Sequence, residues 1–289
     1  MTNHKKIILT AVIYFVIVRI AIASVALANI QTEKPALQVR GITEMGLLVP
    51  AYHKIQFSNG NTYFDYRNEG GQDNAFLFLR FSAEAVLGGR HTIVALYQPL
   101  QLKTNVTLNE DVRIDNVTFP AQTPMDLLYG FDFYRLSYMV DVLKHRKNTE
   151  LSLGASLQMR NAVITFTSSD GSMRVAKRDV GPVPLLKARF RHQFNNQVWI
   201  GAEMDGMWAP IKYINGSNSD VEGAIIDLNV SVGRRLAQSI DGFVNIRYLA
   251  GGAEGTSKDT TGSGDGFTRN WLQFLTFSLG VMFTPTDLP

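Results

Sequence analysis

A strict alternation of polar and apolar residues runs through the stretch TELSLGASLQMRNAV at positions 149–163. One parity holds Glu150, Ser152, Ser156, Gln158 and Arg160, and the other holds Leu151, Leu153, Ala155, Leu157 and Met159. Successive side chains of a β-strand point to opposite faces, so this period of two predicts a strand with one polar and one apolar face. The alternation recurs at 76–87, 130–143, 185–194, 225–236 and 270–283.

The first 28 residues predict a cleavable signal peptide. His4, Lys5 and Lys6 precede an apolar run at 7–18, and Ala26-Leu27-Ala28 matches a small-x-small cleavage site. Arg19 ends the run well short of the roughly 20 apolar residues that a membrane-spanning helix needs. This segment holds three of the 28 Lys and Arg residues and none of the 25 acidic ones. The rest of the chain is therefore formally neutral, and a nucleic-acid partner is not expected.

Ten strands are predicted, at 37–49, 74–88, 91–104, 126–143, 149–167, 182–194, 197–211, 223–237, 241–252 and 268–284. Most are longer than the 9–11 residues with which a tilted strand crosses a bilayer. The connections alternate between short turns and long polar loops, the latter at 50–73, 105–125, 168–181, 212–222 and 253–267. Short periplasmic turns and long external loops are typical of an outer-membrane barrel.

We therefore expect an all-β protein, a transmembrane antiparallel up-and-down β-barrel of ten strands. Asn59-Gly60 predicts a hairpin, which we place as a projection of the first external loop. If this hairpin also crossed the membrane, the barrel would have twelve strands. The expected organisation is a signal peptide at 1–28, a short periplasmic segment at 29–36, the barrel at 37–284 and a tail at 285–289.

In a barrel the apolar row of each strand faces lipid and the polar row faces the lumen. The lumen is then predicted to hold a charge network of Arg135, Arg160, Lys187, Arg189, Arg191, Glu203, Asp205, Asp227 and Arg247. If Phe194 pairs with Val198 around the intervening turn, Arg189 lies opposite Glu203 and Lys187 opposite Asp205. Such pairing predicts a plugged interior, because small barrels lack an aqueous channel. A narrow channel for ions or small solutes is the alternative.

The chemistry of the external rim leaves an enzymatic alternative open. Surface proteases built on ten-stranded barrels place acid and histidine groups at this rim, where the sequence offers only His53, with Asp65 nearby. A lipid-modifying hydrolase would need a serine beside the outward-facing His192, yet Ser152 and Ser156 have the inward parity. No catalytic, cofactor or metal residue is therefore assigned. The candidate contacts of the first loop are His53, Tyr63, Phe64, Asp65 and Tyr66, with packing of the hairpin as the alternative for the aromatic ones.

Four segments resemble successive strands of a family of bacterial outer-membrane β-barrel proteins of unestablished activity. They are ALYQPLQL at 95–102, FYRLSY at 133–138, VGPVPLLKARF at 180–190 and MDGMWAP at 204–210, similar to the family's APL, YRLxY, VPLL and DGxxAP segments, with Gln98 where Ala is expected. The resemblance covers about residues 75–284. It implies the same barrel and transfers no catalytic residue.

The end of the chain resembles the general barrel-assembly signal, with Phe277, Leu279, Val281 and Phe283 at alternate positions. The expected partners are therefore the barrel-assembly machinery and outer-membrane lipids, including lipopolysaccharide, and an external ligand that the sequence does not name. The expected location is the bacterial outer membrane, reached through the periplasm. Its predicted role is structural or one of surface interaction through the external loops.

Overall fold

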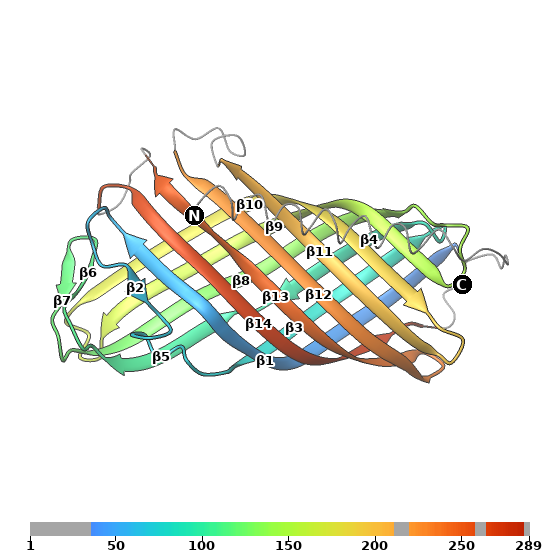
Figure 1. Ribbon diagram of the computed structural model, residues 1–289, viewed down its shortest axis with the longest axis horizontal. Helices are drawn as coiled ribbons and strands as arrows, with labels where there is room; N and C mark the ends of the chain where they lie inside the picture. The colour runs from blue at the N-terminus through green and yellow to red at the C-terminus, as the bar shows by residue number, and fades with distance from the viewer. Residues whose placement is uncertain (1–35, 211–219, 258–263, 286–289) are drawn as a thin grey trace, which may run out of the picture.

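The computed structural model describes residues 36–210, 220–257 and 264–285, and within these ranges the chain is built of strands. Ten membrane-crossing strands pair antiparallel with their neighbours and close into a barrel through β1 and β14 (Figure 1). The predicted ten-stranded barrel is confirmed. Among the described residues no helix is long and apolar enough to cross a membrane.

The strands of the wall are β1 (Leu37–Phe57), β3 (Phe76–Leu87), β4 (His91–Gln98) with β5 (Gln101–Thr107), β8 (Pro124–Asp141), β9 (Thr149–Ser168), β10 (Arg174–Gln193), β11 (Val198–Pro210), β12 (Glu222–Ala237), β13 (Ile240–Thr256) and β14 (Phe267–Phe283). Strands β4 and β5 are one crossing, because both pair with β8 and only Pro99 and Leu100 separate them. Three short strands lie at the long-loop end, namely β2 (Phe64–Asp65), β6 (Val112–Ile114) and β7 (Val117–Phe119).

Several strands continue past their predicted ends. Strand β1 runs to Phe57 rather than 49, and most of the stretch 168–181, expected to be a loop, belongs to β9 and β10. These extensions lie beyond the apolar belt, where the outward side chains include the exposed Arg174 and Arg178. Because the outer face is polar there, these parts of the strands lack the outward apolar row from which the membrane-crossing parts were predicted.

The predicted hairpin at 49–66 does not cross the membrane. Its turn lies at 58–60, with Gly60 at φ 75°, and β2 returns beside β1 with Ile55 opposite Phe64. The sequence placed this hairpin as a projection of the first external loop, and its apolar side chains pack into the barrel mouth. A β-bulge at Ala51, which the β1–β14 register skips, shifts the inward parity of β1 from even to odd positions, and the residues that follow turn into the barrel.

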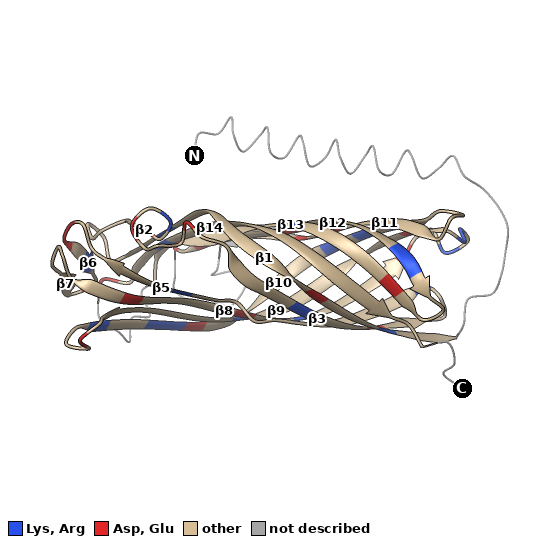
Figure 2. Ribbon diagram, turned by 90° about the horizontal axis from the view of Figure 1, so that it is seen from below, with Lys and Arg blue, Asp and Glu red and all other residues tan. Residues whose placement is uncertain are grey.

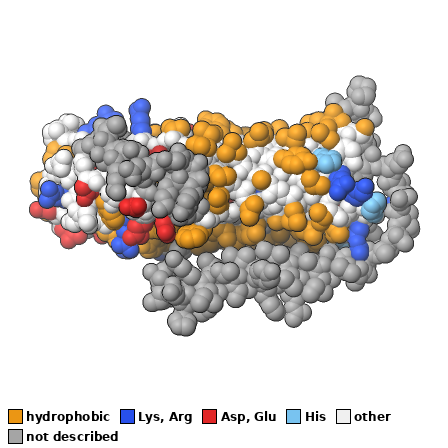
Figure 3. All heavy atoms as spheres, turned by 90° about the horizontal axis from the view of Figure 1, so that it is seen from above, with side chains coloured by type: hydrophobic (Ala, Val, Ile, Leu, Met, Phe, Trp, Pro, Cys, Tyr) orange, Lys and Arg blue, Asp and Glu red, His pale blue; other side chains and the backbone are white. Residues whose placement is uncertain are grey.

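Lipid-facing and lumen-facing residues alternate as predicted. On β9, Leu153 and Leu157 are 50% and 49% exposed, whereas Ser152 and Gln158 are fully buried. Exposed hydrophobic side chains surround the middle of the barrel, with charged side chains toward the two ends (Figure 3). On β1 this apolar belt includes Met45 and Leu47, and the part after the bulge lies outside it.

The interior is filled at two levels. Charged side chains occupy the level near the short turns, and several of the strands in Figure 2 carry acidic and basic positions side by side there. The level near the long loops is an apolar core that includes Leu48, Ile55, Phe57, Phe64, Tyr66, Phe119, Tyr129, Phe166 and Phe274. A charge-paired interior was predicted, and the apolar level was not.

We expect a cysteine at Leu157 to react with a maleimide dissolved in the bilayer and a cysteine at Gln158 to stay protected. Leu157 faces lipid, whereas the neighbouring Gln158 is fully buried in the lumen. The native chain contains no cysteine, so each variant carries a single reactive site. The measurement is the labelled fraction of protein reconstituted in vesicles. Labelling of the Gln158 position and protection of the Leu157 position would contradict the assigned faces.

Candidate functional site

The charge network of the lumen rests on the pairing of β10 with β11. Phe194 donates its backbone N–H to the carbonyl of Val198 at 2.7 Å, and the register places Lys187 opposite Asp205 and Arg189 opposite Glu203. This is the register that the sequence predicts. Because opposite residues on one face of a sheet lie within side-chain reach, both pairs form inside the barrel.

Arg135 on β8 is the centre of this network. Its Nη1 lies 2.8 Å from Asp205 of β11 and 3.0 Å from Asp227 of β12, and its Nε and Nη2 donate to the side chain of Gln158 at 3.0 and 2.6 Å. Arg247 of β13 reaches the same Asp227 at 3.2 Å. One buried guanidinium therefore ties opposite walls of the barrel together across the lumen.

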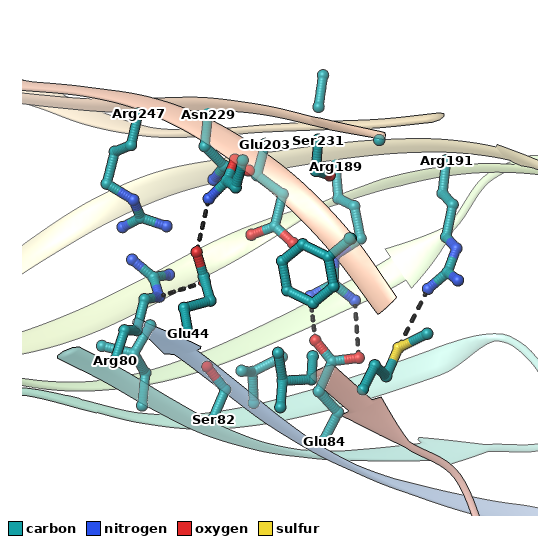
Figure 4. Close-up of a pocket in the computed structure, with 18 of the residues that line it drawn as sticks. Glu44, Arg80, Ser82, Glu84, Arg189, Arg191, Glu203, Asn229, Ser231 and Arg247 are labelled. Atoms are coloured by element: carbon teal, nitrogen blue, oxygen red, sulfur yellow. Dashed lines mark hydrogen bonds and ion pairs between the residues drawn. The ribbon is translucent and has the colours of Figure 1, made fainter. Parts of the chain in front are cut away.

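Arg189 extends the network to the other side of the lumen. It donates from Nε to Glu203 at 2.8 Å and from Nη1 to Glu84 of β3 at 3.2 Å (Figure 4). Lys187 lies 2.9 Å from Glu203 and 2.8 Å from Asp205. These contacts leave each carboxylate with at least one cationic partner, which is the condition under which charges remain buried.

Two predicted members lie apart from this centre. Arg160 lies on β9, closer to the long loops, and pairs with Asp179 of β10, whose side chain is 60% exposed. Arg191 lies near the short turns, 3.2 Å from Asp241, and stacks on Trp199 with 4.1 Å to the ring centroid. The other seven residues of the predicted set lie in one connected group.

The residues that complete the network from the opposite wall were expected in the lumen from their parity, but their partners were not predicted. Arg80 of β3 lies 3.6 Å from Glu44 of β1, and Glu44 also accepts from Asn245 and Ser278 at 2.7 and 2.9 Å. Their inward parity was visible in the sequence, but their partners lie on strands far away along the chain. Figure 4 shows Glu44 and Arg80 facing the residues of β10 and β11 across the lumen.

The space left inside the network is small. A cavity of about 80 Å³ lies between Glu44, Arg80, Glu84, Arg189 and Glu203. A space of this size with polar walls accommodates a few water molecules.

His53 forms a second site, on the part of β1 that lies outside the apolar belt. The bulge at Ala51 turns its ring into the barrel, where it is fully buried. The ring stacks on Tyr66 at 4.6 Å between centroids and meets the edge of Tyr129 at 4.2 Å, and Nδ1 lies 2.6 Å from Oε1 of Gln72. Because Tyr66 and Gln72 belong to the segment after β2, this contact holds the first loop inside the barrel mouth.

Burial lowers the pKa of His53 to about 4, against weaker opposing effects of the Gln72 hydrogen bond and the Asp65 charge. The ring is therefore neutral at neutral pH, in an aromatic surrounding that could not solvate a cation. The ring has no exposed surface at which a substrate could approach it.

The structure places most of the predicted loop contacts inside the protein. His53, Phe64 and Tyr66 are fully buried, and the two aromatic side chains pack within the barrel mouth. Asp65 is also buried. It lies 2.9 Å from Lys54 and accepts from the backbone N–H groups of the following turn.

Tyr63 alone among these contacts lies at the outer face of the barrel. Its hydroxyl is 2.9 Å from that of Tyr52, and the guanidinium of Arg269 lies 4.4 Å from its ring centroid.

His192 is the other candidate histidine. Its Nδ1 lies 2.9 Å from the hydroxyl of Thr149, and its ring packs against Phe194. The nearest candidate serine by sequence parity, Ser156, instead faces the lumen and donates to Asp205.

Within the described ranges, no group of three or more His, Cys, Asp or Glu side chains could hold a metal ion. Glu203 and Asp205, two carboxylates on one face of β11, are occupied by Lys187 and Arg189.

Comparison with known structures supports the architecture. The chain is similar to the outer membrane protease OmpT from Escherichia coli, with a TM-score of 0.53 and 12% identity over 89% of this chain and 99% of that one. At this identity the similarity shows the fold alone. The Pseudomonas putida toluene transporter TodX (TM-score 0.33, 10% identity, 87% and 90% covered) and the β domain of the Bordetella autotransporter BrkA (0.33, 12%, 87% and 100%) also match, too weakly to carry an argument.

No protein-family model matches the sequence, and no curated protein sequence matches it. The fold is a closed ten-stranded antiparallel β-barrel, similar to that of the outer membrane protease OmpT.

Replacing Arg135 with Met is expected to lower the free energy of unfolding by about 3–5 kcal/mol, because it takes one cation out of a buried network in which Asp205 and Asp227 then keep only Lys187 and Arg247 as close partners. The measurement is reversible urea unfolding in lipid vesicles, followed by tryptophan fluorescence. Arg235→Met is the matched control, since this side chain is 48% exposed and exposed ion pairs contribute about 0–1 kcal/mol. Equal losses in the two variants would contradict the central role of Arg135.

The stability of the first loop is expected to fall on acidification between pH 6.5 and 4. The pKa of His53 is about 4 in the folded protein, against 6.5 as its ordinary value. The unfolded chain therefore takes up a proton first as the pH falls, and this lowers the free energy of unfolding by up to about 3 kcal/mol at pH 4. The measurement is the difference in unfolding free energy between wild type and His53→Gln as a function of pH. A constant difference over this range would contradict the buried neutral ring.

Proposed function

We propose that this protein is a closed, non-enzymatic barrel of the bacterial outer membrane with a structural or surface-interaction role. The observation that supports the proposal is the filling of the lumen at two successive levels. Ions that entered from the short-turn end would meet the paired charges around Arg135. Beyond that level they would meet the apolar core around Phe64, Tyr66 and Phe274, where a hydrated ion loses its solvation.

The first loop and the β6–β7 hairpin together form the cap of the barrel. Asp115, in the turn of this hairpin, accepts from the hydroxyl of Ser58 at 3.0 Å and through its carbonyl from Asn61 at 2.7 Å. The apolar side chains of the hairpin, Val112, Ile114 and Phe119, are buried beneath it. These contacts join the two parts of the cap, and the ion pair of Asp115 with Lys177 of β10 anchors the cap to the wall.

The contact surface for an external partner is then the outer face of this cap. The first loop uses its aromatic residues for packing, so it does not offer the surface that the sequence predicted. The hairpin instead exposes Asp111, Arg113, Asn116 and Thr118. Polar side chains on a rigid hairpin suit recognition of a hydrated partner, because loops on a rigid scaffold commonly carry the binding function. Lipopolysaccharide and the barrel-assembly machinery remain predicted partners on the grounds given by the sequence.

The two alternatives receive less support. A narrow channel would need a continuous polar path, and the cavity of about 80 Å³ lies below an apolar core. A hydrolase would need an accessible base beside a nucleophile, whereas His53 is enclosed and His192 pairs with a threonine.

The purified protein in planar bilayers is expected to show no stepwise conductance, because both levels of the lumen are filled. A conducting porin in the same bilayer serves as the positive control for insertion. Reproducible unitary steps from the protein would replace the proposal with the channel alternative. Loss of such steps in Phe64→Trp would then place the path through the cap.

The surface role is tested on intact cells with a membrane-impermeant maleimide. A cysteine at Asn116 is expected to be labelled and a cysteine at Phe64 is not, because the first is exposed and the second is buried. Labelling of Phe64→Cys would show that the loop opens in the membrane, and protection of Asn116→Cys would show that the cap does not face the exterior.

A further inference from the structure

Basic residues gather at the end of the barrel that carries the short turns. The β3–β4 turn holds Arg90, and the β8–β9 turn holds Lys144, His145, Arg146 and Lys147. Figure 3 shows Lys, Arg and His side chains at this end. We call Arg90 and the residues 144–147 the basic rim.

The two turns of the basic rim are neighbours in space. Strand β4 pairs with β8, and the backbone N–H of Asp141 donates to the carbonyl of Arg90 at 2.8 Å. The β10–β11 turn lies next to the β8–β9 turn, because Gln193 donates its backbone N–H to the carbonyl of Asn148 at 2.7 Å. The cations of two separate turns therefore present one continuous charged edge.

The exposed cations of this edge, Lys144 and Lys147, have no exposed acidic side chain of the described residues beside them. Among the described residues here, no acidic side chain is exposed: Glu84, Asp141 and Asp241 are buried and Glu150 is half-buried. Glu84 and Asp241 pair with arginines that face the lumen, and Glu150 accepts from Ser152. The opposite end differs, since Asp73, Glu110, Asp111, Asp126 and Asp170 are all exposed there. The exposed acidic side chains compared here therefore lie at the long-loop end of the barrel, and the short-turn end exposes basic ones.

Exposed apolar side chains lie directly beside the basic rim. Leu87 precedes the first turn and Val142 precedes the second, and Phe194 lies at the start of the next turn. Such a band of apolar side chains next to cations matches the boundary between acyl chains and headgroups. A water-soluble acidic protein would meet the cations but would not cover this apolar band.

We propose that the basic rim binds the headgroups of anionic phospholipids in the periplasmic leaflet of the outer membrane, with their acyl chains against Leu87, Val142 and Phe194. Short turns mark the periplasmic end of such barrels, which places the rim in the leaflet made of phospholipid. Lysine and arginine side chains near an anionic membrane surface each contribute about 1 kcal/mol to its attraction. The binding would fix the depth of the barrel in the membrane at one end.

The experiment measures bound lipid by native mass spectrometry of the purified protein in mixed micelles with equal amounts of phosphatidylglycerol and phosphatidylcholine. Wild type is expected to retain phosphatidylglycerol in preference to phosphatidylcholine. In the variant Lys144→Gln/Lys147→Gln the ratio of the two bound lipids is expected to fall at least about fivefold, the change that corresponds to one membrane-proximal cation. Both side chains lie exposed in a turn, and retained β-structure by circular dichroism verifies folding.

The matched control is Arg174→Gln/Arg178→Gln, which removes two exposed cations from β10 at the other end of the barrel. This control is expected to keep the wild-type ratio. Equal losses in the two double variants would overturn the proposal by showing general attraction to charge. An unchanged ratio in the Lys144 and Lys147 variant would also overturn it, and would leave a soluble anionic partner as the occupant of the rim.

Discussion

The exclusion of charge from hydrocarbon is the constraint on which the rest of this structure depends. A Lys or Arg side chain that faces lipid at the midplane of a bilayer costs about 2–4 kcal/mol, so every strand that crosses must turn its charges inward. Arg135, Lys187, Arg189 and Asp227 are therefore confined to a narrow lumen. There they must pair with one another, because an unpaired buried charge is costlier still. The same constraint closes the barrel, since an open sheet edge would leave backbone groups unpaired in lipid.

Two kinds of packing fill the lumen, and they differ in what they do. The charged level near the short turns joins strands that are distant along the chain, and Arg135 alone links β8 with β9, β11 and β12. The apolar level near the long loops resembles the core of a soluble protein, with the ring of His53 held between Tyr66 and Tyr129. The first level cross-links distant strands of the barrel, and the second packs its interior near the long loops.

The similarity of fold between this protein and OmpT does not imply that the two share a catalytic activity. At 12% identity the likeness concerns the path of the backbone, and function resides in the side chains that a fold presents. Here the mouth of the barrel is covered by a loop that packs inward and by a hairpin anchored through Asp115. The exposed surface at this end is polar and the rim at the other end is basic, so the two ends of the barrel present surfaces of different charge.

Much of the fold follows from the sequence by itself. A period of two that recurs in six segments, within strands too long for a soluble sandwich, predicts an antiparallel barrel. A single turn after Phe194 is enough to set Lys187 and Arg189 opposite their acidic partners. These features are local, because each depends on the neighbours of a residue in its own strand or hairpin. The inward parity of the lumen charges is local in the same way.

Only the tertiary structure decided which distant groups meet. The pairing of Arg189 with Glu84, and of Arg135 with Asp227, depends on how the closed barrel brings its far walls together. The burial of His53 depends on the bulge at Ala51, which shifts the parity by one residue and leaves no mark in the pattern of hydrophobicity. Beyond the apolar belt the outer face becomes polar while an apolar core fills the interior, so the rule that places apolar side chains outside no longer holds there, and the position of each side chain is decided by packing.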